Sequence, residues 1–525
     1  MPYIDDDKLI YNIRELPEAF SITSGDLLVV EDTEGTKTID FNNIIIGLDN
    51  TTFGTTITQN ATDIVAISAA EIADANSPRP VITDNSTITA SLTGNGLAES
   101  PLGIPQIRVP SPTVHIVRDD VYNTDGRYQE LGTSERPFVV RTTTDLRTII
   151  AGLPSGRHVK LGPGVYQVDD GASPGNMFAG VELNKDMIFE GAGKGASIIQ
   201  FKENIPGPIA SGLRQLINIS GGSTQAEQTD VTVSNLTLDA NFAASLTPGC
   251  RSGHGCIGAG NERLTIEHVE CIKFGRESHH QETFPMFLVR RNAINGYVMQ
   301  LYVNDVEMHT EEQGTDNDKG MATLLVGSET NVASQGDCRG VVRGFRTTRT
   351  GTGVGLGMVG TSKMLFDDCY VDTSIQPQGY PFLHDTLSAS NVTIQNSYFK
   401  GGSQSYPIVF GGSSAGTSPC DNMIIKGNVI EKTNAQLQNV LLTRSNGSVI
   451  ISNNHFIGTT TDPSYTYAIL GIGTPIPTAF TALVHDNMVS LSGSDTIGRV
   501  STATPGVISH NNYFLETGGV VPPTE

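Results

Sequence analysis

The chain repeats one short pattern of apolar and polar positions over more than half of its length. The pattern reads apolar, any, apolar, any, Asn or Asp, any, any, apolar, and residues 449–456 are a clear copy of it. Alternating apolar residues indicate a strand with one buried face. The Asn or Asp that follows fits a turn, because these side chains hydrogen-bond their own backbone and tolerate unusual dihedral angles.

Nine copies of the pattern align along the chain. Their apolar positions hold a single polar residue, Ser509, and successive turn positions lie 25 to 63 residues apart. The longest interval fits two coils, so we expect an unmatched copy near residues 340–357. The nine turn positions are Asn235, His268, Asp305, Asp368, Asn396, Gly427, Asn453, Asp486 and Asn511.

A period of this length indicates stacked repeats. Each unit is a short strand plus a turn, with no helical periodicity between copies, so the sequence predicts an all-β fold, a right-handed parallel β-helix. Its coils would stack about 4.8 Å apart, and amides stacked at that spacing can form side-chain ladders.

The remaining segments predict the domain organisation. Residues 1–50 contain a β-hairpin pattern and form a small N-terminal unit, residues 51–75 a short helical stem, and residues 76–135 a linker or neck rich in Pro, Ser, Thr, Asn and Gly. The β-helix takes residues 136–518, with a short helix over residues 144–154 that covers its open end. Residues 519–525 remain as a C-terminal tail.

The composition of the chain excludes some classes of binding partner. The formal net charge of −22 argues against nucleic acid and against an anionic membrane surface. No apolar run is long enough for membrane insertion. The first residues lack a secretory signal, so we expect synthesis in a cytoplasm, with the six scattered cysteines reduced. We expect no cofactor and no metal.

Three motifs in the first coils carry a resemblance. They are Leu153-Pro154-Ser155-Gly156, Pro163-Gly164-Val165-Tyr166 and Glu190-Gly191-Ala192-Gly193. Together they resemble the start of the pectate-lyase-like β-helix superfamily, in the version found in bacteriophage tailspikes and tail fibres. Residues 13–39 also look like the virion-attachment segment of many phage tail proteins.

The resemblance implies a function and its partners. Proteins of this type are usually parallel homotrimers in the virion, where the N-terminal unit, here residues 1–50, docks on other tail or adaptor proteins. They bind polysaccharide on the host surface, and many of them also cleave it. The resemblance therefore implies a tail fibre or tailspike that binds polysaccharide, or alternatively a polysaccharide depolymerase.

Two long excursions interrupt the coils at residues 275–296 and 310–336. Loops that leave a rigid scaffold commonly carry binding residues. We expect these loops to emerge side by side and wall a groove, the alternative being contacts with a neighbouring subunit. Tyr380 is a candidate for stacking on a sugar ring. The candidate substrate-binding residues are His279, His280, Arg290, Arg291, Glu312, Asp316 and Tyr380.

Catalysis on a glycosidic bond needs two carboxylates. Asp367 lies between inward positions and should face outward, whereas its neighbour Asp368 falls in the turn column. The catalytic candidates are Asp367, Asp372, Asp385 and Glu282. A β-elimination would instead use a base with cations, for which Arg343, Arg346 and Arg349 are available.

A third possibility is a free pectinolytic enzyme. Gly253-His254-Gly255 resembles a motif of polygalacturonases, but in that family paired aspartates precede it, whereas Asp367 and Asp368 follow it here. The order of the motifs therefore disfavours this possibility.

Overall fold

The computed structural model describes the chain in segments. The described residues are 3–5, 8–10, 27–32, 35–40, 113–119, 130–169, 177–203, 212–219, 228–241, 252–260, 262–276, 286–290, 298–309, 322–328, 337–348, 353–360, 363–375, 379–384, 389–402, 406–410, 420–432, 440–442, 447–460, 469–472, 481–493 and 506–515. The chain divides into two compact units, residues 1–107 and 108–525.

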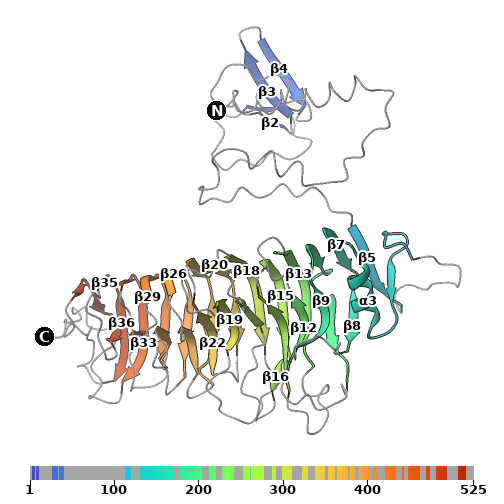
Figure 1. Ribbon diagram of the computed structural model, residues 1–525. Helices are drawn as coiled ribbons and strands as arrows, with labels where there is room; N and C mark the ends of the chain where they lie inside the picture. Colours follow the sequence, from blue (N-terminus) through green and yellow to red (C-terminus); the bar gives the residue numbers. More distant parts are fainter. Residues whose placement is uncertain are drawn as a thin grey trace. The chain divides into compact units, whose positions relative to one another are not determined.

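The larger unit is a parallel β-helix, consistent with the right-handed form that the sequence predicts. Successive coils contribute first and second arms to one 23-stranded sheet, and the coils from β9 to β34 also contribute strands to an 11-stranded sheet. Strands of successive coils pair in parallel and follow one another along the unit (Figure 1). The sequence thus winds repeatedly through the same three positions.

The strand bounds follow this order. The first arms are β5 (Thr113–Arg118), β7 (Arg157–Leu161), β10 (Met187–Glu190), β13 (Asp230–Asp239), β15 (Arg263–Ile272), β18 (Val298–His309), β20 (Asp337–Arg343), β23 (Lys363–Asp367), β26 (Ala389–Gln395), β29 (Cys420–Lys426), β32 (Ser448–Ser452), β35 (Thr481–His485) and β37 (Val507–His510); β13, β15 and β18 continue into the second arm.

The other strands of the large sheet, which include the separate second arms, are β6 (Phe138–Val140), β8 (Gly164–Val168), β11 (Ser197–Phe201), β21 (Arg346–Thr348), β24 (Tyr370–Asp372), β27 (Tyr398–Gly401), β30 (Val429–Lys432), β33 (His455–Thr460), β36 (Met488–Gly493) and β38 (Tyr513–Phe514). The 11-stranded sheet holds β9 (Met177–Leu183), β12 (Gly212–Ile219), β14 (Ser252–Ala259), β16 (Gly275–Arg276), β17 (Met286–Arg290), β19 (Ala322–Ser328), β22 (Val354–Val359), β25 (Tyr380–His384), β28 (Ile408–Phe410), β31 (Val440–Leu442) and β34 (Leu470–Ile472).

The predicted turn column is confirmed by the backbone. All nine turn residues have a positive φ, from 49° at Asp305 to 66° at Gly427, so each adopts the left-handed conformation that bends the first arm into the second. Asn, Asp and Gly tolerate this conformation best. The unmatched copy is also present, because Gly344 has a φ of 60° and follows β20.

The pattern missed this coil because its inward positions hold small and polar residues. Val342 is buried at one of them as expected, but the other two inward positions hold Gly340 and Thr347. A Cβ on Gly340 would lie 2.0 Å from the carbonyl oxygen of Leu301, so only glycine fits at this position.

An asparagine ladder runs one residue beyond the predicted turn column. Asn428, Asn454, Asn487 and Asn512 are almost fully buried. The Nδ2 group of each of the first three donates to Oδ1 of the next, at 2.8 to 3.0 Å. The expectation of an amide ladder holds, but Asn454 forms it, whereas its neighbour Asn453 supplies the bend.

The solenoid begins before the boundary that the sequence suggests. β5 lies in the segment 76–135, yet it pairs in parallel with β7. The predicted helix is confirmed as α3 (Asp145–Gly152), which buries Leu146 and Ile150 and packs on β6, β8 and β9. Thr144 makes no capping hydrogen bond through its side chain.

The described residues of the smaller unit form two antiparallel strand pairs. β1 (Tyr3–Asp5) pairs with β2 (Lys8–Ile10), and β3 (Leu27–Asp32) pairs with β4 (Gly35–Asp40), which confirms the predicted hairpin. The predicted stem, 51–75, and the predicted tail, 519–525, lie outside the described residues. Within the described part of the chain, no helix is long and apolar enough to cross a membrane.

Candidate functional site

The glycine-rich turn between β10 and β11 lies against the strand of the next coil. Gly193 N donates to Asn235 O, and Gly195 N donates to Thr237 Oγ1, each at 2.8 Å. Gly193 and Gly195 have φ values of 138° and 72°. Such values favour glycine, so this turn holds Lys194 over the outer face of the large sheet.

Lys194 reaches two acidic residues on β18. Its Nζ lies 2.9 Å from Asp305 Oδ2 and 2.9 Å from Glu307 Oε1. His268 on β15 adds a further contact, with Nδ1 2.7 Å from Asp305 Oδ2. The side chain of Lys194, from the turn after β10, therefore meets Asp305 on β18, which also contacts His268 on β15.

These contacts keep the groups charged. Burial disfavours the charged form of Lys194, but its hydrogen bonds to Asp305 and Glu307 outweigh that cost and raise its pKa. Burial likewise opposes ionisation of Asp305, yet hydrogen bonds from His268 and Lys194 lower its pKa. For Glu307, the hydrogen bond from Lys194 is the largest cause of a lowered pKa.

Glu270 and His309 complete the group, which we call the Lys194 cluster (Lys194, His268, Glu270, Asp305, Glu307 and His309). Glu270 and Glu307 pair in register on β15 and β18. Their carboxylates and the His309 imidazole offer ligand atoms within 4.8 Å of one another. Two carboxylates and an imidazole could hold a divalent cation, but Lys194 already neutralises Glu307.

The Lys194 cluster lies where the two predicted loops begin. Ile272 pairs with His309 at the ends of β15 and β18. The segments 275–296 and 310–336 come after these strands, but they are not the uninterrupted loops that the sequence predicts, because the first holds β16 and β17 and the second holds β19, all strands of the 11-stranded sheet. The cluster is therefore a charged surface near the ends of β15 and β18.

Asp367 faces outward as predicted, but neighbouring coils cover it. It stands in register between Arg343 and Gln395 and is 8% exposed. Its Oδ2 accepts a hydrogen bond from Arg343 Nε at 3.0 Å, and its Oδ1 accepts one from Asn396 Nδ2 at 2.9 Å. Burial opposes ionisation, but hydrogen bonds from Asn396, Gln395 and Arg343 lower the pKa. This geometry suits a structural ion pair.

The other described candidates do not converge on Asp367. Asp372 Oδ1 accepts hydrogen bonds from N and Oγ of Ser374, which makes a local turn. Tyr380 belongs to the other sheet, and burial raises its pKa. The side chain of Arg290 lies outside the described residues, as do His279, His280, Glu282, Arg291, Glu312, Asp316 and Asp385.

The cations proposed for β-elimination are also engaged. Arg343 pairs with Asp367, and Arg346 Nη2 lies 3.6 Å from Asp368 Oδ2. Arg349 lies outside the described residues. A uronate would have to displace these carboxylates to reach Arg343 or Arg346.

The alternation of apolar and polar positions does not predict the Lys194 cluster, although the repeat register contains part of it. Counting two residues beyond the turn positions His268 and Asp305 gives Glu270 and Glu307, which pair in the structure. Lys194 carries no such signal, because it lies in the turn between β10 and β11, outside the repeated pattern.

Comparison with known proteins gave structural neighbours alone: no family model and no curated protein matches the chain. The A-module of the mannuronan C-5 epimerase AlgE4 of Azotobacter vinelandii is 16% identical, with a TM-score of 0.40, over 75% of this chain and all of that one. A rhamnogalacturonan lyase is 10% identical, with a TM-score of 0.41, over 78% of this chain and 88% of the lyase. The surface adhesin PfbA of Streptococcus pneumoniae is 10% identical, with a TM-score of 0.37, over 76% of this chain and 90% of the adhesin. Similarity this distant implies nothing about activity.

Proposed function

We propose that the chain is a subunit of a bacteriophage tail fibre or tailspike that recognises polysaccharide on the host surface. The N-terminal unit, residues 1–50, attaches to other tail proteins, and three copies form a parallel trimer. The flank of the β-helix meets the polysaccharide. The motifs of the first coils support this assignment, and so does the solenoid that follows them.

The observation that carries the proposed recognition is the Lys194 cluster. It gathers an ammonium, carboxylates and imidazoles on the outer face of the solenoid, near the ends of β15 and β18. The side chains of Lys194, Glu307 and Asp305 are 24%, 34% and 40% exposed. Hydroxyl groups of a sugar can donate to these carboxylates and accept from the ammonium, and hydrogen bonds to charged groups are the stronger ones.

A glycan panel tests this function. The full chain is applied to immobilised capsular and O-antigen polysaccharides, and Glu307→Gln is compared with Lys363→Gln, which changes an exposed lysine on β23. We expect at least one polysaccharide to bind, with binding reduced in Glu307→Gln and unchanged in Lys363→Gln. Absence of binding to every polysaccharide, or equal binding by both variants, would refute the assignment.

A second candidate function is cleavage of the same polysaccharide. It is favoured by the pair Glu270 and Glu307, because the spacing of the strands holds their carboxylates close together. Retaining glycosidases place two carboxyl groups roughly 5–5.5 Å apart. Glu307, which Lys194 keeps ionised, would be the nucleophile, and Glu270 the acid and base.

Product analysis separates binding from cleavage. The polysaccharide that binds is incubated with the full chain, and new reducing ends and unsaturated uronates are measured. Hydrolysis predicts new reducing ends without unsaturated products, and loss of the activity in Glu270→Gln. A bound polysaccharide that stays intact would leave recognition as the function.

A further inference from the structure

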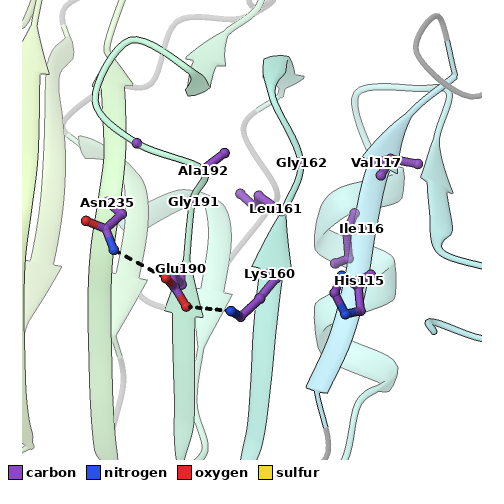
Figure 2. Close-up of a pocket in the computed structure, with 11 residues that line it drawn as sticks. His115, Ile116, Val117, Lys160, Leu161, Gly162, Glu190, Gly191, Ala192 and Asn235 are labelled. Atoms are coloured by element: carbon purple, nitrogen blue, oxygen red, sulfur yellow. Dashed lines mark hydrogen bonds and ion pairs between the residues drawn. The ribbon is translucent and has the colours of Figure 1, made fainter. Parts of the chain in front are cut away.

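A separate pocket lies at the start of the solenoid. Figure 2 shows it between the first strands, where β5, β7 and β10 present their outer faces. Its volume is about 480 Å³, within the range of about 300–1,000 Å³ typical of small-molecule sites. We call it the His115 pocket, and its polar lining is His115, Lys160, Glu190 and Asn235.

Strand register places three titratable side chains in one row of this pocket. His115 pairs with Lys160, and Lys160 pairs with Glu190. Parallel strands are about 4.8 Å apart, so the three groups can contact one small ligand together. Gly162 and Gly191 also line the pocket, and a Cβ on Gly191 would lie 2.3 Å from the carbonyl oxygen of Asn235, so glycine is required there.

Glu190 is satisfied by the protein itself. His158 Nε2 lies 2.6 Å from its Oε2, and Asn235 Nδ2 donates to its Oε1 at 3.3 Å. Burial opposes its ionisation, but the hydrogen bond from His158 and the charge of Lys160 help to lower its pKa. The glutamate therefore does not need a ligand to balance its charge.

The two basic groups retain binding capacity. Lys160 Nζ stands 3.6 Å from Glu190 Oε2, beyond hydrogen-bond distance, and its side chain is 45% exposed. Across the described part of the chain, the His115 ring has no hydrogen bond or ion pair, although its charge acts on Glu135. A pocket with two available donors and a neutralised acid favours an anion, even in a chain of net charge −22.

We propose that the His115 pocket binds a sugar unit that carries a carboxylate, such as a hexuronic acid. The carboxylate accepts hydrogen bonds from Lys160 and His115, and ring hydroxyls face Glu190 and Asn235. This inference rests on the proposed recognition of polysaccharide, to which it adds a second site and the class of sugar.

Titration calorimetry on the full chain tests the pocket with free glucuronate. The methyl ester of glucuronate, glucose and inorganic phosphate serve as comparison ligands. We expect glucuronate to bind more tightly than its ester or glucose, and also more tightly than phosphate, which lacks the ring hydroxyls. Equal binding of the ester, or stronger binding of phosphate, would overturn the proposed ligand class.

Variants locate the binding. Lys160→Gln and His115→Gln should each weaken glucuronate about tenfold, as expected for loss of one charged hydrogen bond, whereas Lys363→Gln should not. Unchanged affinity in Lys160→Gln, or no binding by the unmodified chain, would refute the pocket. If glucuronate binds through Lys160 but the polysaccharide panel is negative, the pocket stands and the proposed function fails.

Discussion

Lys194 and Asp305 are 111 residues apart in the chain, yet the Nζ of one lies 2.9 Å from Oδ2 of the other. The contact joins the turn after the third first-arm strand, β10, to β18, and it passes over β13 and β15. Repeats in a solenoid normally contact only their neighbours. Lys194 therefore joins coils that are not adjacent, at the site that we assign to polysaccharide.

Lys194→Met should weaken polysaccharide binding and change stability little. The ion pairs are partly exposed, so their loss should lower the free energy of unfolding by less than about 1 kcal/mol. Polysaccharide affinity should fall because Asp305 and Glu307 then repel each other and lose their orientation. Denaturant unfolding and the glycan panel measure the two effects, and unchanged binding would contradict the assigned role.

Asp367→Asn should lower stability and leave binding and cleavage unchanged. The lost ion pair should reduce the free energy of unfolding by about 1–2 kcal/mol, because Arg343 is half exposed and screened. Since the folded-state pKa of Asp367 is lowered, its contribution is present above the ordinary value of about 3.9 and is lost as pH falls through the folded value.

Unfolding of Asp367→Asn measured against pH checks this assignment. The variant should lose part of the acid sensitivity that the unmodified chain shows. Loss of cleavage with unchanged stability would instead make Asp367 a catalytic residue.

Asn454→Ala should be strongly destabilising, whereas Asn453→Gly should be tolerated. Removing the Asn454 amide leaves the N–H of Asn428 and the carbonyl oxygen of Ile425 without their partners. Each buried group left unpaired costs about 1–3 kcal/mol. Glycine at 453 keeps the φ of 55° without strain. Equal midpoints in thermal unfolding would refute the ladder.

Gly340→Ala should disrupt the coil that the pattern missed. Its added Cβ would overlap the carbonyl oxygen of Leu301 on the neighbouring strand, so β18 and β20 would have to separate. Gly152→Ala is the matched control, because nothing lies within 4 Å of its Cβ position. The soluble yield and the midpoint temperature of thermal unfolding should fall for Gly340→Ala alone. Equal yields and midpoints for the two variants would contradict this packing.

Much of the fold follows from the sequence, because a solenoid repeats its burial pattern. Val449, Ile451 and Phe456 are buried as their alternation predicts, and Asn453 takes the expected bend. Asn454 was missed because a polar residue at a buried position is acceptable only when its partners stack on it. That condition becomes visible when neighbouring coils are placed together.

The site is less visible in the sequence, since it depends on contacts between coils. Asp367 was correctly placed on the outer face, but the alternation does not show that Arg343 and Gln395 cover it. Lys194 lies in a glycine-rich turn, outside the repeated pattern. The conformation of the turn, residues 191–196, decides that Lys194 contacts β18, and the repeat pattern does not predict that conformation.

Light scattering tests the proposed trimer. The full chain has a mass of 55.9 kDa, and size-exclusion chromatography with light scattering should give three times that value. A stable monomer at all concentrations would contradict the fibre or tailspike assignment.

A structure of the full chain with an oligosaccharide from the bound polysaccharide tests the central claim most directly. We predict sugar density over the Lys194 cluster, with hydroxyl groups in contact with Glu270 and Glu307. Density confined to another face, with the Lys194 cluster in contact only with protein, would contradict the assigned site.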